Sequence, residues 1–125
     1  MLVNITIPIQ PATKKNSQQI CRNGKGRPLI RQSDRYTAYE EAALLYLRRH
    51  KWAGSLPVNV RAVFYVPDRR RRDLVNLLEA LDDCLVRAGV LPDDCWAIIR
   101  SHDGSHVEVD KLNPRTEIEI SEVKA

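Results

Sequence analysis

The sequence predicts an α+β fold in which a mixed β-sheet carries two main helices on one side. Apolar and polar residues alternate near the amino terminus and again over residues 58–66, which is typical of half-buried strands. Leucines recur at helical spacing between residues 74 and 85, which indicates an amphipathic helix. At 125 residues the chain has room for one hydrophobic core, so we expect a single domain spanning residues 1–125.

The predicted order of elements is β-α-β-α-β-β, and its first half contains one strand and one helix. The strand covers residues 2–9, and a polar, basic connection follows over residues 11–33. Within this connection, residues 28–30 are a candidate for a short strand. Ser33 or Asp34 is suited to cap a helix that runs to about Lys51. One face of this helix is expected to contain Tyr39, Ala42, Ala43 and Tyr46, with Tyr36 as a further candidate.

The second half of the chain alternates in the same way between strands and a helix. A strand over residues 58–66 precedes a helix from Asp73 to Ala88, where Gly89 favours termination. Two further strands are predicted, over residues 96–100 and residues 115–123.

Composition excludes several classes of protein. No apolar run approaches the roughly 18 residues that a membrane span requires, and the amino terminus lacks the basic flank of a secretion signal. The three cysteines form no CxxC pair, which favours reduced thiols over disulfides or a zinc site. We therefore expect a cytoplasmic protein that contacts no membrane.

The charges are segregated along the chain. Residues 1–72 carry 15 Lys and Arg against 4 Asp and Glu, a net charge of +11. Residues 73–125 carry 5 against 12, a net charge of −7. Because cationic surfaces gain affinity by releasing counterions from phosphates, the first half is expected to face a polyanion such as DNA.

Acidic side chains stand beside this basic half in a pattern that suggests phosphodiester chemistry. Asp73 directly follows the run Arg69–Arg72 at a helix start, and Asp93 and Asp94 follow the same helix. Carboxylates near an anionic substrate make sense if they hold Mg²⁺, which prefers oxygen ligands and activates water. Simpler interpretations remain open: Asp73 as a helix cap, Asp93 and Asp94 as turn formers, and the arginines as a solvated face or non-specific phosphate patch.

These pieces stand together in a segment that resembles a known family. Residues 67–77, followed by Asp83, Ala88-Gly89 and Asp93-Asp94, resemble the core of the RusA family, as do residues 11–16, 101–105 and 113–120. The resemblance implies a homodimeric, Mg²⁺-dependent endodeoxyribonuclease, often of phage or prophage origin, that resolves four-way (Holliday) DNA junctions by paired symmetric nicks. Mn²⁺ is the expected substitute. The family's metal-binding carboxylates correspond to Asp73 and Asp94, with Asp93 adjacent.

The chain departs from the family pattern at two positions. The family has a second essential aspartate in a D-x-D-N arrangement, where this chain has Val75, and a lysine where it has Glu79. Residues four apart share one helix face, and helical side chains lean toward the amino terminus. Our hypothesis is that Glu79 replaces the missing carboxylate, with Asp93 or a water as the other candidates for that position.

Other residues are assigned supporting roles. Asn76 is a candidate to orient a metal ligand. Trp52 and Trp96 are interpreted as core or dimer-contact residues rather than as base-stacking platforms. Two alternative functions are a branched-DNA-binding protein whose catalysis is impaired by Val75 and a nuclease of broader flap or fork specificity. The predicted DNA-binding residues are Lys14, Lys15, Asn16, Arg22, Lys25, Arg27, Arg31, Arg69, Arg70, Arg71 and Arg72.

Overall fold

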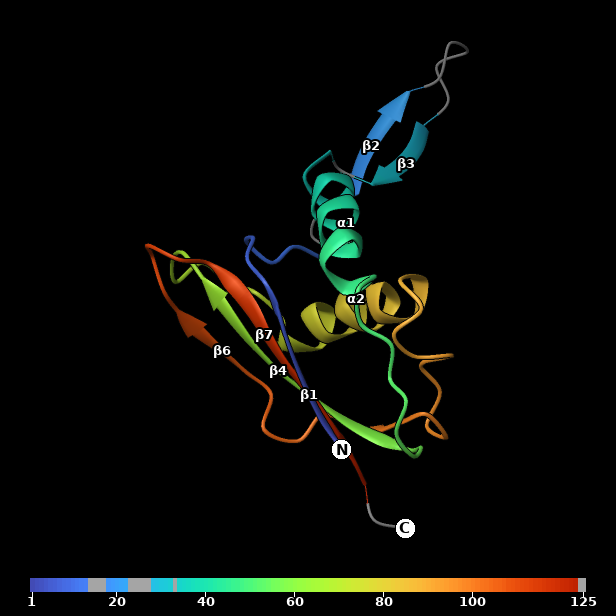
Figure 1. Ribbon diagram of the computed structural model, residues 1–125. Coiled ribbons are helices and arrows are strands. Elements are labelled where there is room, and N and C mark those ends of the chain that lie inside the picture. Colours follow the sequence, from blue (N-terminus) through green and yellow to red (C-terminus); the bar gives the residue numbers. More distant parts are fainter. Residues whose placement is uncertain (14–17, 23–27, 33, 124–125) are drawn as a thin grey trace.

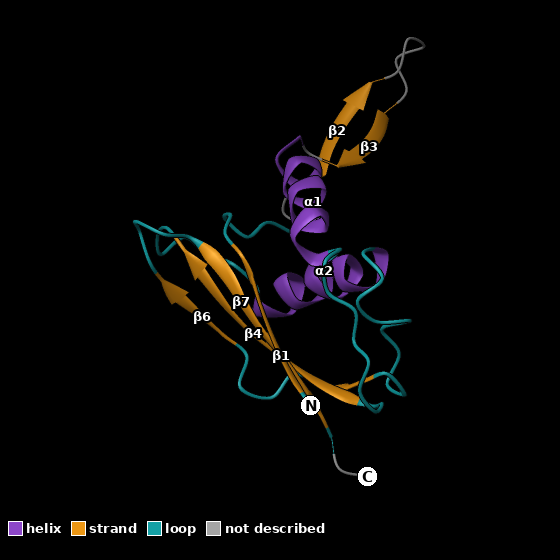
Figure 2. Ribbon diagram, in the orientation of Figure 1, coloured by secondary structure: helices purple, strands orange, loops and turns teal. Residues whose placement is uncertain are grey.

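The computed structural model describes residues 1–13, 18–22, 28–32 and 34–123, and of residues 18–22 and 28–32 only the backbone. It contains a mixed sheet, two helices and a separate two-stranded ribbon (Figures 1 and 2). The elements are β1 (Leu2–Ile7), β2 (Gln18–Arg22), β3 (Pro28–Gln32), α1 (Asp34–Leu47), β4 (Val58–Val66), α2 (Leu74–Arg87), β5 (Ile99–Ser101), β6 (His106–Val109) and β7 (Arg115–Glu122).

The main sheet has the order β1-β7-β4, and both β5 and β6 pair with the other edge of β4, at different positions along it. β7 pairs antiparallel with β1 and β4, whereas β5 and β6 run parallel to β4, so the sheet is mixed as predicted. In the register, Ile5 lies opposite Ile118 and Ile118 opposite Ala62. All three are buried. Alternate residues of these strands therefore form the apolar face that the helices cover.

Both helices lie on the same side of the sheet (Figure 1). The buried side of α2 includes Leu77, Leu81 and Leu85, as the leucine spacing predicted. α2 ends with Ala88 as its C-cap, and Gly89 adopts a φ of 81°, which glycine tolerates without steric cost. The predicted second helix and the predicted strand over residues 58–66 are thus confirmed.

Other boundaries differ from the prediction. β1 ends at Ile7 rather than at residue 9, because Pro8 has no N–H to continue the ladder. α1 ends at Leu47 rather than near Lys51, because the chain turns there and the N–H of Trp52 donates to the carbonyl of Val90 at 3.0 Å. Its buried residues are Tyr36, Tyr39, Ala43 and Leu47, and Tyr46, predicted on that face, is 40% exposed.

The region after α2 was predicted least well. Residues 96–98 form a turn, because the N–H groups of Ile98 and Ile99 both donate to the carbonyl of Cys95 at 2.9 Å. The third predicted strand is therefore displaced to β5, and β6 was not predicted at all. β2 was not predicted either, whereas the short strand expected at residues 28–30 is confirmed within β3. No helix among the described residues is long and apolar enough to cross a membrane.

Candidate active site

Asp73 occupies the amino-terminal end of α2. Its backbone is extended, with φ −97° and ψ 121°, and its carbonyl accepts the first helical hydrogen bond, from Leu77 at 3.1 Å. Its carboxylate makes no capping hydrogen bond, although the residue holds the N-cap position. Instead it accepts a hydrogen bond from Nδ2 of Asn76 at 3.2 Å, and Nε of Arg71 lies 3.9 Å from its Oδ1. A carboxylate that is half exposed and held from the side can bind a cation.

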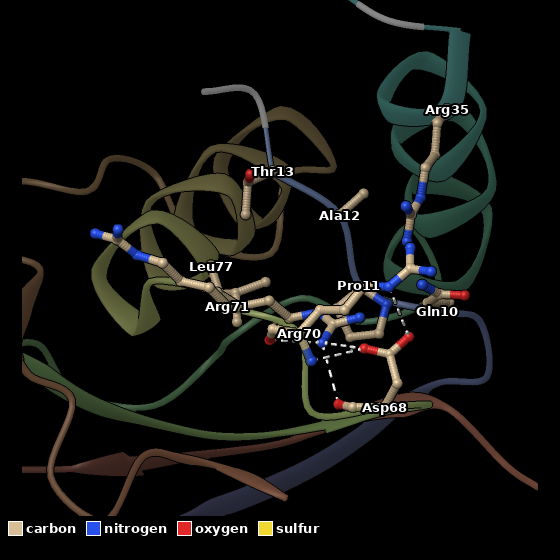
Figure 3. A pocket seen from close by; sticks show the side chains of 10 residues that line it. Gln10, Pro11, Ala12, Thr13, Arg35, Asp68, Arg70, Arg71 and Leu77 are labelled. Atoms are coloured by element: carbon tan, nitrogen blue, oxygen red, sulfur yellow. Dashed lines mark hydrogen bonds and ion pairs between the residues drawn. The ribbon is translucent and has the colours of Figure 1, made fainter. Parts of the chain in front are cut away.

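A cleft of about 160 Å³ opens beside this helix end (Figure 3). It lies between the segment after β1, the start of α1 and the loop that leads into α2. Four arginines and a single aspartate contribute to its walls, so the cleft is strongly cationic and suits a phosphate group. Its lining consists of Gln10, Pro11, Ala12, Thr13, Arg35, Asp68, Arg70, Arg71, Arg72 and Leu77.

Asp68 organises the loop of this cleft. Nη1 of Arg72 donates to Oδ1 of Asp68 at 2.9 Å and to the carbonyls of Asp68 and Arg70 at 3.2 and 3.1 Å. Oδ1 of Asp68 also accepts the N–H of Arg70 at 3.0 Å, and the hydrogen bond from Arg72 holds the pKa of Asp68 below its usual value. The loop therefore has a fixed shape with the guanidinium of Arg72 built into it.

The four consecutive arginines thus divide into two kinds. Arg72 has a side chain only 16% exposed and shapes the loop, whereas the side chains of Arg70 and Arg71 are 86% and 93% exposed. Arg69 is exposed but does not line the cleft. The outward-facing pair is therefore the better candidate for contact with a DNA backbone.

Arg35 was not among the predicted DNA-binding residues. It is the second residue of α1, far from the arginine run in sequence, and Figure 3 shows it reaching from α1 into the same cleft. Its charge was the only sequence signal. Several predicted residues, Lys14, Lys15, Asn16, Lys25 and Arg27, lie outside the described residues, and of Arg22 and Arg31 only the backbone positions in β2 and β3 are described.

Asp93 and Asp94 lie exposed in the loop after α2. Oδ1 of Asp93 accepts the N–H of Asp94 at 2.8 Å, which is a local turn interaction of the kind that the simpler interpretation expected. Burial raises the pKa of Asp82 on α2, and the negative charge of Asp94 adds to that rise. Asp94 is therefore close enough to α2 to act electrostatically on it.

The carboxylates do not form a ready-made metal centre. Among the residues that the structure describes, no three His, Cys, Asp or Glu side chains are grouped so that they could hold a metal ion. Glu79 and Val75 are both exposed, one turn apart on α2, and Glu79 already has an interaction partner of its own. The donor chemistry nevertheless fits Mg²⁺, which is commonly held by one or two carboxylates with waters and substrate phosphates completing its shell.

Comparison with known proteins shows the family. The family model for endodeoxyribonuclease RusA matches residues 8–121. Crossover junction endodeoxyribonuclease RusA of Escherichia coli K12 is 30% identical over 95 residues, and the protein of that name from Enterobacteria phage 82 has the same identity. The Shigella sonnei relative is 32% identical over 97 residues, and each match covers 76% of both chains. The chain therefore belongs to the RusA family of endodeoxyribonucleases.

Proposed function

We propose that this protein is a metal-dependent endodeoxyribonuclease that resolves four-way DNA junctions by paired symmetric nicks. The observation that carries the proposal is the position of Asp73 at the helix end beside a cationic cleft, in a chain of this family. The relatives named above are crossover junction endodeoxyribonucleases. A carboxylate beside a phosphate-binding surface is the arrangement that metal-assisted phosphodiester cleavage requires.

Each residue of the site has a separate task in this proposal. Arg35, Arg70 and Arg71 bind the sugar-phosphate backbone, and Arg72 maintains the loop through Asp68. Asp73 and Asp94 hold Mg²⁺, with Asn76 fixing the orientation of the Asp73 carboxylate. When bound, the metal lowers the pKa of a water molecule and offsets charge on the leaving oxygen.

A homodimer would deliver two such sites to one junction. A four-way junction has equivalent opposed strands, so a two-fold dimer can place one carboxylate pair at each of two phosphates. Support comes from the outer edge of β6, which in the described part of the chain pairs only with β4. Val107 and Val109 on that strand are 37% and 47% exposed, and Leu112 just beyond it is 94% exposed. These three residues give an apolar edge suited to a second copy.

The test is cleavage of a labelled, immobile four-way junction in Mg²⁺ and in Mn²⁺. Wild-type protein is expected to produce paired nicks at symmetric positions, and none in the presence of a chelator. Asp73→Asn and Asp94→Asn should abolish nicking while leaving junction binding intact, with Asp103→Asn as a matched control on an exposed aspartate. Nicking by either site variant at the wild-type rate would reject the assignment.

One observation favours a second candidate, a branched-DNA-binding protein with impaired catalysis. Val75 stands where the family pattern has an aspartate, and its side chain is 71% exposed and cannot ligate a metal. Under this alternative, the protein binds the junction in every metal and never cuts it. Competition with flaps and forks in the same assay measures whether an active enzyme has the broader specificity.

A further inference from the structure

Trp96 is the most exposed large aromatic side chain that the structure describes, at 73%. The sequence led us to interpret it as a core or dimer-contact residue, and the core interpretation is wrong, whereas Trp52 is buried as expected. The reason is the turn that starts at Cys95, which places residues 96–98 before β5 rather than in it. Trp96 therefore projects from the same loop that carries Asp93 and Asp94, two residues beyond Asp94.

Arg100 lies against this ring. Its Cζ is 5.2 Å from the centroid of the Trp96 ring, and its Nε donates a hydrogen bond to the carbonyl of Trp96 at 3.4 Å. Such a cation–π contact is attractive and limits the positions that the indole can adopt. One face of the ring thus has a cationic neighbour, and the large exposed fraction leaves much of the remaining ring surface to solvent.

The surroundings of Trp96 do not resemble the centre of a protein interface. Its neighbours Asp93, Asp94, Cys95 and Ala97 are exposed and are charged or small. Cores of protein interfaces are depleted in charged residues, and the apolar edge at β6 meets that description better. An aromatic ring paired with arginine and flanked by polar groups is instead typical of a platform for nucleobases.

We propose that Trp96, supported by Arg100, stacks on a nucleobase whose face is exposed at the branch point of the DNA, beside the proposed cleavage site at Asp94. This inference rests on the proposed function. In an intact duplex each base is covered by its neighbours, whereas a branch point or single strand offers an open face. Stacking by Trp96 therefore favours branched DNA over linear duplex and orients the strand that is cut.

The test uses the intrinsic fluorescence of tryptophan, which nucleobase stacking quenches. In the variant Trp52→Phe, Trp96 is the sole tryptophan, so its emission is observed directly. If Trp52→Phe is unstable because Trp52 is buried, the emission of Trp96 is obtained instead as the difference between wild type and Trp96→Phe. The protein is titrated in a chelator with a four-way junction and with a linear duplex of the same sequence. The emission of Trp96 is expected to fall strongly with the junction and much less with the duplex.

Affinity provides the second readout. Trp96→Ala should weaken junction binding on the order of 10-fold, and Trp96→Phe should retain most of it, because phenylalanine still stacks. As a control, Leu45→Ala removes a comparably exposed apolar side chain from α1 and should leave the affinity for the junction unchanged. The inference is overturned if the emission of Trp96 stays unchanged while the junction is bound. It is also overturned if that emission changes with protein concentration in the absence of DNA, because such a change indicates that Trp96 lies in a dimer contact. Failure of the wild type to bind any junction rejects the proposed function itself.

Discussion

Nε2 of His102 lies 2.9 Å from Oδ2 of Asp82, and this contact joins the middle of α2 to the segment that follows β5. The same nitrogen is 3.0 Å from Oδ1, so the imidazole faces both carboxylate oxygens. Both side chains are largely buried, at 13% exposed for Asp82 and 26% for His102. The pair therefore fixes α2 against the strands, close to the loop that carries Asp94.

This pair predicts a coupled effect on stability. His102→Ala leaves the Asp82 carboxylate buried without its partner and should lower the free energy of unfolding by about 1–3 kcal/mol. Asp82→Ala with His102→Ala should cost clearly less than the two single changes added together, because no unpaired group remains. Urea unfolding of the four proteins measures the coupling. Additive effects would mean that the contact contributes nothing.

The cost of His102→Ala should also depend on pH. Burial raises the pKa of Asp82, so ionising this group is less favourable in the folded than in the unfolded chain. The stability that such a group contributes is complete below its unfolded pKa and is lost as pH rises through the folded pKa. Without His102, which lowers the pKa, that loss grows. The variant should therefore be closer to wild type at about pH 3.5 than at pH 7, measured by unfolding at both.

Two tyrosines of α1 predict the alkaline limit of stability. Burial raises the pKa values of Tyr36 and Tyr39 far above the ordinary value of 10.0. Since the unfolded chain ionises first, stability should fall as pH rises above about 10 and through the folded values. Tyr39→Phe should flatten this fall between pH 9 and pH 11, whereas Tyr46→Phe, an exposed control on the same helix, should not. Equal slopes in all three proteins would contradict the prediction.

The accuracy of the sequence predictions follows from how locally each element is determined. The leucine repeat of α2 and the alternation of β4 are properties of their own segments, so both were located to within a residue or two. β5 and β6 have few residues and weak patterns, and their positions depend on pairing with a distant strand, β4. The core interpretation of Trp96 was wrong for the same reason, because the exposure of this side chain is set by the turn at Cys95, which the local sequence pattern does not reveal.

The candidate site shows the same division. The order of arginines and Asp73 is local, so sequence reasoning placed Asp73 at the start of α2. The contribution of Arg35 depends on how α1 packs beside the loop before α2, which no local pattern encodes. The distinct part played by Arg72 likewise follows from Asp68, four residues earlier, whose hydrogen bonds only the folded loop defines.

Salt dependence should separate the outward-facing arginines from those engaged elsewhere. Each phosphate contact that is removed lowers the slope of log K against log salt concentration by about 1. Arg70→Gln and Arg71→Gln are each expected to show this reduction for junction DNA. Arg87→Gln, a control at the other end of α2 whose guanidinium binds Glu40, should keep the wild-type slope. Unchanged slopes in both cleft variants would show that DNA binds elsewhere.

The departure at Val75 predicts a rescue. If Glu79 acts as the third carboxylate, Glu79→Gln should lose junction cleavage and bind Mn²⁺ more weakly, while junction affinity stays the same. Val75→Asp would restore a carboxylate one turn nearer to Asp73 and should return cleavage to the Glu79→Gln protein. Because the side chain of Val75 is 71% exposed, its replacement should change stability by no more than about 0.5 kcal/mol.

Two outcomes of that experiment exclude Glu79 as a ligand. Cleavage by Glu79→Gln at the wild-type rate would show that the carboxylate is not needed. Equal stimulation by Leu45→Asp, which adds an aspartate to an exposed position of α1, would show that only net charge matters. Rescue confined to Val75→Asp, with matching recovery of Mn²⁺ affinity, would instead tie both residues to one metal ion, because a carboxylate can substitute for another only within reach of the same cation.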